Sequence, residues 1–155
     1  MTTTVQFYHL LSTSRERAVP SLMQKALRAG NRVVMLLDSE AALKTMSDAL
    51  WSADPNGFLP HGSQRDGHEK EQPIFLSLTD VNPNGADLLC VLDGSSPASL
   101  ANYGKVLDVF DGNNEAATEA ARARWAQYKT AGHALHYIKQ QPGGGWKLEM
   151  EVTAA

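Results

Sequence analysis

Histidine and carboxylate side chains gather in one polar stretch of the sequence and could in principle bind a metal ion. They are His61, His68, Glu69 and Glu71. Their spacing matches no zinc motif, and the single cysteine, Cys90, lies far away in the apolar run LLCVL. Because a flexible loop seldom holds ligands in place, the sequence favours solvated loop residues over a metal site. We expect no metal and no cofactor.

A set of catalytic groups is not visible in the sequence. Serine and histidine both occur, but no glycine-flanked nucleophile elbow is present. Asp87 and Asp93 flank an apolar strand and could act as carboxylates at its ends, although turn and capping roles suit them better. The phosphate-binding motifs G-x-G-x-x-G and G-x-x-x-x-G-K-[ST] are absent. We therefore expect no enzymatic activity, and a small nucleotide-dependent or hydrolytic enzyme is the alternative.

The segment EAATEAARARWAQYK at 115–129 combines an aromatic side chain with cations at helical spacing. Arg122, Trp125 and Lys129 are three and four residues apart and share one stripe of a helix, while Arg124 lies at the margin of another stripe. An aromatic ring between cations suits a peptide that carries carboxylates and an apolar side chain. Packing of Trp125 in the core is an equally supported alternative.

A second aromatic group lies in the segment ALWSADPNGFLPHG at 49–62, where an apolar helical pattern runs into turn residues. Trp51, Phe58 and Leu59 stand beside proline, asparagine and glycine, which favour the surface. These side chains either fold back over the preceding helix or form an exposed anchor for a protein partner. The residues by themselves leave both possibilities open.

The composition narrows the class of protein. With 155 residues, 43% of them hydrophobic and 20% charged, we expect one domain, 1–155, with a core of its own. The net charge of −3 gives no general attraction to nucleic acid, so any contact with DNA should be indirect. The N-terminus shows no signal-peptide pattern, and no apolar run is long enough to span a membrane. We expect a soluble, cytoplasmic protein that binds no membrane.

Apolar strands alternate with helices along the chain. Strands are predicted at 5–11, 32–38, 73–78, 86–92 and 105–110. Helices are predicted at 21–29 with Pro20 in the first helical position, at 40–51 after Ser39, and from Asn113 or Asn114 to Lys129. A long loop at 52–72, a weak helical turn at 97–103 and a closing hairpin of 133–139 with 146–152 complete the pattern. The alternation predicts an α/β, three-layer, nucleotide-binding-like (Rossmann-like) fold with a largely parallel sheet flanked by helices.

Several short motifs, taken in order and spacing, resemble one protein family. They are Ala49-Leu-Trp51, Phe58-Leu-Pro-His-Gly62, Gln72-Pro73, Asn82-Pro-Asn-Gly-Ala-Asp87, Phe110-Asp-Gly112 and Arg122-Ala-Arg-Trp-Ala-Gln-Tyr-Lys-Thr-Ala-Gly-His133. Together they are similar to the chi subunit family of the bacterial DNA polymerase III holoenzyme. The resemblance is strongest over 5–140, which leaves 141–155 as an extra hairpin or tail. It implies a non-catalytic adaptor in DNA replication.

The resemblance also implies two partner-binding surfaces. One binds the psi subunit of the clamp loader and, in some members, a repair helicase; by position it comprises Trp51, Phe58, Leu59, Pro60 and His61. The other binds the acidic, apolar C-terminal tail of the single-stranded-DNA-binding protein; by position it comprises Arg122, Trp125, Arg124, Lys129 and the nearby Val106. Family members often have a lysine where this chain has Ala126. One cation for the tail is therefore missing, and Arg122 or Lys129 would have to compensate.

Overall fold

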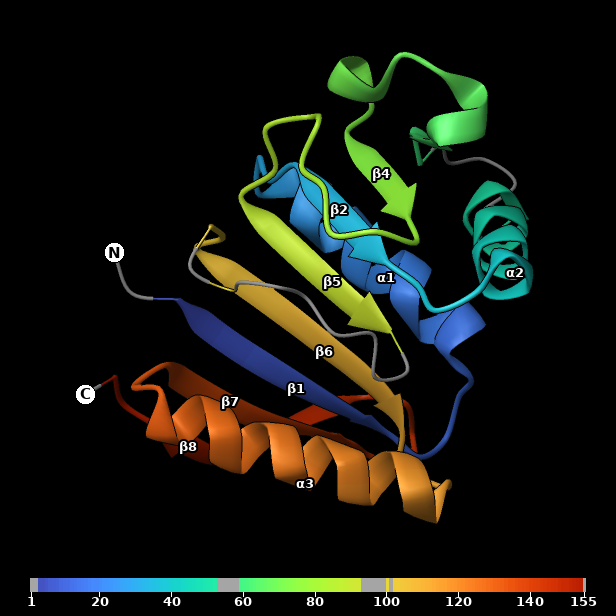
Figure 1. The fold of residues 1–155 in the computed structure, drawn as a ribbon. Coiled ribbons are helices and arrows are strands. Elements are labelled where there is room, and N and C mark those ends of the chain that lie inside the picture. Colours follow the sequence, from blue (N-terminus) through green and yellow to red (C-terminus); the bar gives the residue numbers. More distant parts are fainter. Residues whose placement is uncertain (1–2, 53–58, 93–99, 101, 155) are drawn as a thin grey trace.

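The computed structural model describes residues 3–52, 59–92, 100 and 102–154. Among them, one eight-stranded sheet has the strand order β3-β4-β2-β5-β6-β1-β7-β8 (Figure 1). The strands are β1 (Thr4–Leu10), β2 (Val33–Leu36), β3 (His61–Ser63), β4 (Ile74–Ser77), β5 (Leu88–Leu92), β6 (Lys105–Asp111), β7 (Ala134–Gln140) and β8 (Trp146–Val152). Neighbouring strands are parallel except β7 and β8, which are antiparallel. The predicted α/β fold with a largely parallel sheet is confirmed.

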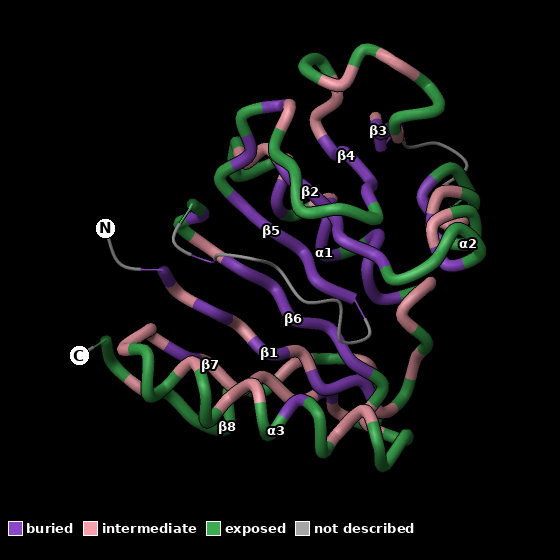
Figure 2. Tube along the Cα trace, viewed as in Figure 1, coloured by how far each residue is buried: buried purple, intermediate pink, exposed green. Residues whose placement is uncertain are grey.

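Helices cover both faces of the sheet and make the three layers. The helices are α1 (Arg15–Arg28), α2 (Glu40–Ser52) and α3 (Glu115–Thr130). Figure 1 shows α1 and α2 on one face and α3 on the other, and a separate hydrophobic cluster lies on each side. Every residue of the central strands β2 and β5 is buried (Figure 2), as expected of parallel strands covered on both faces.

Side-chain caps begin two of the helices at the predicted positions. The hydroxyl of Ser39 accepts a hydrogen bond from the Ala42 amide at 3.1 Å, at the start of α2. The side-chain oxygen of Asn114 accepts one from the Ala117 amide at 3.0 Å, at the start of α3. These bonds satisfy amides that have no partner within the helix.

The first helix differs from the prediction. We expected it to begin at Pro20, but α1 begins at Arg15 and Pro20 lies inside it. A proline there removes one backbone hydrogen bond of the helix. The Pro20 ring is buried, together with Val19 and Leu22, on the face of α1 that packs against the sheet. This burial offsets the lost hydrogen bond. A local rule for proline therefore gave the wrong helix start.

The long loop predicted at 52–72 contains regular structure where it is described. Residues His61–Ser63 form β3, which pairs with β4, and two 3₁₀ turns follow at Gln64–Asp66 and Glu69–Glu71. A strand of three residues is too short to show an alternating pattern. The predicted closing hairpin is confirmed as β7 and β8, while the helical turn predicted at 97–103 lies largely outside the described residues. No helix of the described part of the chain is long and apolar enough to cross a membrane.

Candidate peptide-binding site

A groove of about 420 Å³ lies against α3, within the range of pockets that hold small ligands. We call it the α3 groove. Its side chains come from α3, from β1 and β6 of the sheet, and from the β7–β8 hairpin. They are Phe7, Phe110, Thr118, Ala121, Arg122, Trp125, Tyr137, Lys139, Glu149 and Met150. The consecutive elements β6, α3, β7 and β8 therefore meet the distant strand β1 at this groove.

Aromatic rings form much of the groove. Phe7 and Phe110 are buried side chains of the sheet, each 1% exposed. The Trp125 ring packs edge-on against Phe7 at a centroid distance of 5.5 Å and against Tyr137 at 6.1 Å. Trp125 is half-buried and also lines the groove. Core packing and a place in the groove, the two alternatives for Trp125, are therefore both observed, because one part of the indole completes the core while another part borders the groove.

Two cations give the groove a positive character. Arg122 is exposed on α3, and Lys139 reaches the groove from β7. The pKa of His9 is lowered, first by burial and then by the positive charges of Lys139 and Arg122. The same buried histidine contacts the Tyr137 hydroxyl through Nδ1. Both cations therefore act on one small region of the sheet.

Our sequence reasoning missed Lys139. It lies in a predicted strand, where a single lysine indicates no more than a solvent-exposed position. The signal that could have found it is the two-residue period, because Leu135, Tyr137 and Lys139 share one face of β7. Leu135 is fully buried beside α3, so its strand neighbours two and four residues on must face the same helix.

Strand β8 supplies the remaining side chains of the groove. Tyr137 pairs with Met150 and Ile138 pairs with Leu148, so Glu149 is an extra residue in a bulge of the hairpin. The pKa of Tyr137 is raised, mainly by burial, with Glu149 adding to the rise and Arg122 opposing it. A carboxylate and a thioether therefore lie close to the aromatic rings and the arginine.

Arg124 has a different position from Arg122. Its Nε and Nη2 donate to the two oxygens of Asp108 on β6 at 2.7 and 2.9 Å, a bidentate ion pair. The two side chains are 13% and 2% exposed. Burial raises the pKa of Asp108, and the neighbouring guanidinium opposes this rise. Arg124 therefore joins α3 to the sheet, and its charge is already paired.

Two further residues of the expected tail site also lie away from the α3 groove. Val106 is 1% exposed and belongs to the core. Lys129 is exposed one helical turn beyond Trp125, and it is not among the described residues that line the groove. Of the five residues carried over by position, Arg122 and Trp125 are thus the pair that the fold brings together in this groove.

The second expected surface is described only in part, because Phe58 lies outside the described residues. Trp51 at the end of α2 is 58% exposed, and its ring centroid is 4.6 Å from that of His61. Leu59 and His61 are buried at 6% and 7% exposure, and Pro60 is half-buried. Trp51 is therefore the largest side chain that this region presents to solvent among the described residues.

The burial of His61 corrects its prediction as a solvated loop residue. Its Nδ1–H donates to the Leu59 carbonyl at 2.7 Å, so Nε2 can accept from the Ser47 hydroxyl at 3.2 Å. Pairing of β3 with β4 draws the histidine against α2. His68 and Glu71 do lie at the surface, 3.4 Å apart. Within the described residues, no group of three or more histidine, cysteine or acidic side chains is placed to hold a metal ion.

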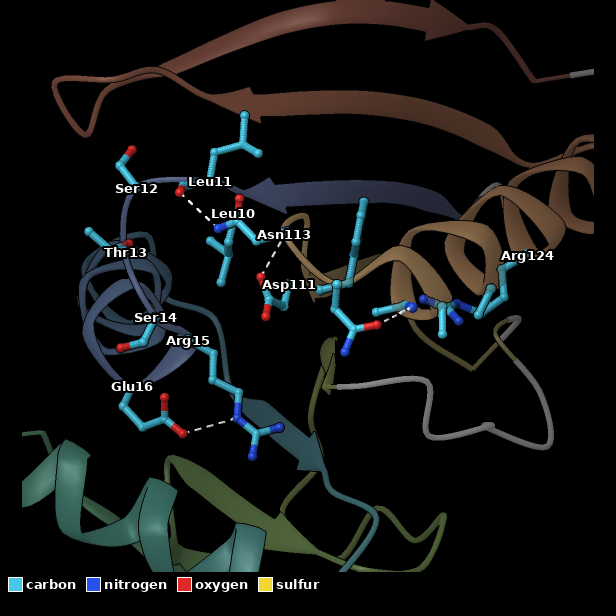
Figure 3. A pocket seen from close by; sticks show the side chains of 15 residues that line it. Leu10, Leu11, Ser12, Thr13, Ser14, Arg15, Glu16, Asp111, Asn113 and Arg124 are labelled. Atoms are coloured by element: carbon cyan, nitrogen blue, oxygen red, sulfur yellow. Dashed lines mark hydrogen bonds and ion pairs between the residues drawn. The ribbon is translucent and has the colours of Figure 1, made fainter.

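A larger hollow, of about 740 Å³, opens at the carboxyl ends of β1 and β6 (Figure 3). From here the chain leaves to α1 on one face and to α3 on the other, the place where α/β proteins commonly bind nucleotides. The backbone amides of Leu11, Ser12 and Thr13 all donate to one oxygen of Gln140, at 3.0, 2.8 and 3.1 Å. The loop amides that could hold a phosphate are thus bonded to a side chain of this protein.

Comparison with known proteins gives the family. The family model described as DNA polymerase III chi subunit, HolC, matches residues 1–136. DNA polymerase III subunit chi of Haemophilus influenzae is 30% identical over 139 residues, covering 87% of this chain and 96% of the relative. The subunit of the same name from Pseudomonas aeruginosa is 29% identical, covering 86% and 94%. That of Escherichia coli is 24% identical, covering 78% and 82%.

The match spans most of this chain and nearly the full length of the first two relatives, so the resemblance seen in the sequence motifs is confirmed. The relatives carry the name of a polymerase subunit, which agrees with the expectation that the chain is an accessory protein of DNA replication and not itself an enzyme. The chain belongs to the DNA polymerase III chi subunit family.

Proposed function

We propose that this protein is a non-catalytic adaptor of the replisome. It links the clamp loader, through the psi subunit, to the C-terminal tail of the single-stranded-DNA-binding protein. In this role it acts in the cytoplasm and reaches DNA only through its partners. The observation that carries the proposal is the α3 groove, where Arg122 and Lys139 stand beside the Trp125 ring.

The chemistry of the α3 groove fits an acidic tail with an apolar side chain. Guanidinium and ammonium groups bind carboxylates through charge-assisted hydrogen bonds. Beside them, Trp125, Tyr137 and Met150 offer an apolar surface for a side chain of the tail. The net charge of −3 does not oppose this assignment, because the two cations are local to the groove.

The psi subunit is proposed to bind at Trp51. An exposed tryptophan is a suitable anchor for a partner helix. The buried neighbours Leu59 and His61 would hold the end of α2 in place rather than contact the partner. A repair helicase is a further candidate for the same surface.

The first test is titration of the protein with a peptide of the last residues of its own single-stranded-DNA-binding protein. Arg122→Ala and Trp125→Ala are compared with Arg28→Ala, which removes an exposed arginine on the opposite side of the sheet. We expect the first two variants to bind at least about tenfold more weakly, as for anchors of an interface, and the control to bind like the wild type. Thermal unfolding of each variant checks that it is folded.

Absence of peptide binding by the wild type would refute the proposed tail-binding role. The alternative of a nucleotide-dependent or hydrolytic enzyme is tested in the same thermal assay. A nucleotide or divalent metal that raised the Tm by several degrees would favour it, because a ligand bound only by the folded state stabilises that state.

A further inference from the structure

Four side chains of the α3 groove lie beyond the part of the chain that the family model matches. The match ends at residue 136, and the four that follow it are Tyr137, Lys139, Glu149 and Met150. They belong to the last part of β7 and to β8. The groove therefore combines a part within the family match, with Arg122 and Trp125, and a part contributed by the C-terminal hairpin.

The hairpin is held firmly against the rest of the sheet. Strand β7 pairs with β1 along six residues, and β8 continues the sheet beyond it. The Trp146 ring packs edge-on against Tyr8 of β1 at a centroid distance of 5.1 Å. Gln140 is 3% exposed, and its side-chain oxygen accepts hydrogen bonds from the three loop amides that follow β1. Side chains on this hairpin are therefore positioned by the fold and are not those of a loose tail.

The charges that the hairpin brings to the groove have opposite signs. The pKa of His9 is lowered mainly by burial, and the positive charges of Lys139 and Arg122 lower it further. Both cations therefore act on the same histidine. Glu149 acts on Tyr137 in the sense opposite to Arg122. Met150, 54% exposed, pairs with Tyr137 and extends the aromatic surface toward solvent. The hairpin thus adds one cation and one carboxylate to the lining of the groove.

We propose that the C-terminal hairpin is a selectivity element of the α3 groove, which orients an acidic, apolar peptide by attraction at Lys139 and repulsion at Glu149. This proposal rests on the proposed function, because the peptide is the tail of the single-stranded-DNA-binding protein. A peptide carboxylate binds Arg122 and Lys139 together. Its apolar side chain packs between Trp125 and Met150, and Glu149 keeps further carboxylates away from the bulge of the hairpin.

The test uses the full-length protein and the tail peptide, with Lys139→Met and Glu149→Gln as opposed variants. Each keeps a side chain of similar length and removes one charge. Lys139→Met should bind roughly three- to tenfold more weakly, the effect of one charged contact at a partly exposed site. Glu149→Gln should bind roughly two- to threefold more tightly, because a repulsion between carboxylates is removed. Both differences should shrink as salt is raised.

Lys25→Met is the matched control, because it removes an exposed cation of α1, on the opposite side of the sheet from the groove. It should bind like the wild type, and thermal unfolding should show all three variants folded. Equal binding by Lys139→Met and Lys25→Met, or weaker binding by Glu149→Gln, would overturn the role of the hairpin. If Arg122→Ala lost binding in that case, the proposed function would stand and only this inference would fail. Absence of binding by the wild type would overturn both.

Discussion

Replacing Arg124 by alanine should destabilise the fold far more than replacing Asp108 by asparagine. The Arg124 guanidinium makes two short bonds to a carboxylate that is 2% exposed. Arg124→Ala therefore leaves a charge buried in the sheet without its partner. Asp108→Asn removes the buried charge and leaves an arginine at the edge of α3, 13% exposed, which can turn toward water.

The expected magnitudes follow from that difference in burial. Removing one partner of a buried ion pair costs about 3–5 kcal/mol of the free energy of unfolding, because the remaining charge is uncompensated. At roughly 2–4 °C per kcal/mol for a domain of this size, Arg124→Ala should lose roughly 6–20 °C in Tm. Asp108→Asn should cost about 1–2 kcal/mol, as for lost hydrogen bonds.

The loss in Arg124→Ala should depend on pH with a defined sign. Burial raises the pKa of Asp108 above its usual 3.8, and Arg124 opposes the rise, so removing Arg124 raises the pKa further. A carboxyl whose pKa is higher in the folded than in the unfolded state stabilises the fold at low pH and loses that contribution as pH rises through the folded value. The deficit of Arg124→Ala should therefore be largest at neutral pH and smaller in acid.

Urea unfolding of the wild type, both single variants and the double variant, at pH 7 and pH 5, measures these differences. The double variant Asp108→Asn with Arg124→Ala should recover part of the stability that Arg124→Ala loses. A cost of less than about 1 kcal/mol for Arg124→Ala at pH 7, the value typical of a surface pair, would contradict a buried ion pair at this position. An equal deficit at both pH values would contradict it as well.

Two other changes test residues outside the α3 groove. Trp51→Ala should change the free energy of unfolding by no more than about 1 kcal/mol, because the side chain is mostly exposed. The same variant should bind the psi subunit at least about tenfold more weakly. An unfolded variant would instead assign Trp51 to the core. Gln140→Ala removes the acceptor of three loop amides and should cost about 1–3 kcal/mol in urea unfolding, and an unchanged midpoint would show that water replaces the side chain without loss.

Only the part of the candidate site that lies on a single helix could be predicted from the spacing of residues in the sequence. Arg122 and Trp125 were found because three residues along a helix bring two side chains to neighbouring positions. Lys139 and Glu149 were missed because they lie on the two strands of the hairpin, nine and nineteen residues beyond the end of α3. Arg124 was assigned to the same site, although its partner Asp108 lies on another element. Spacing cannot tell which of two arginines meets a buried carboxylate.

Short-range periodicity and residues in fixed order were enough to predict seven of the eight described strands, the three described helices apart from the start of α1, the α/β class, two helix caps and the family. The tertiary structure decided which elements became neighbours. Strand β1 lies between β6 and β7, although both pair with it from about a hundred or more residues away along the chain. That order follows from burial of apolar surface across the whole chain, which no local pattern encodes. It places α3 beside the hairpin and so creates the groove.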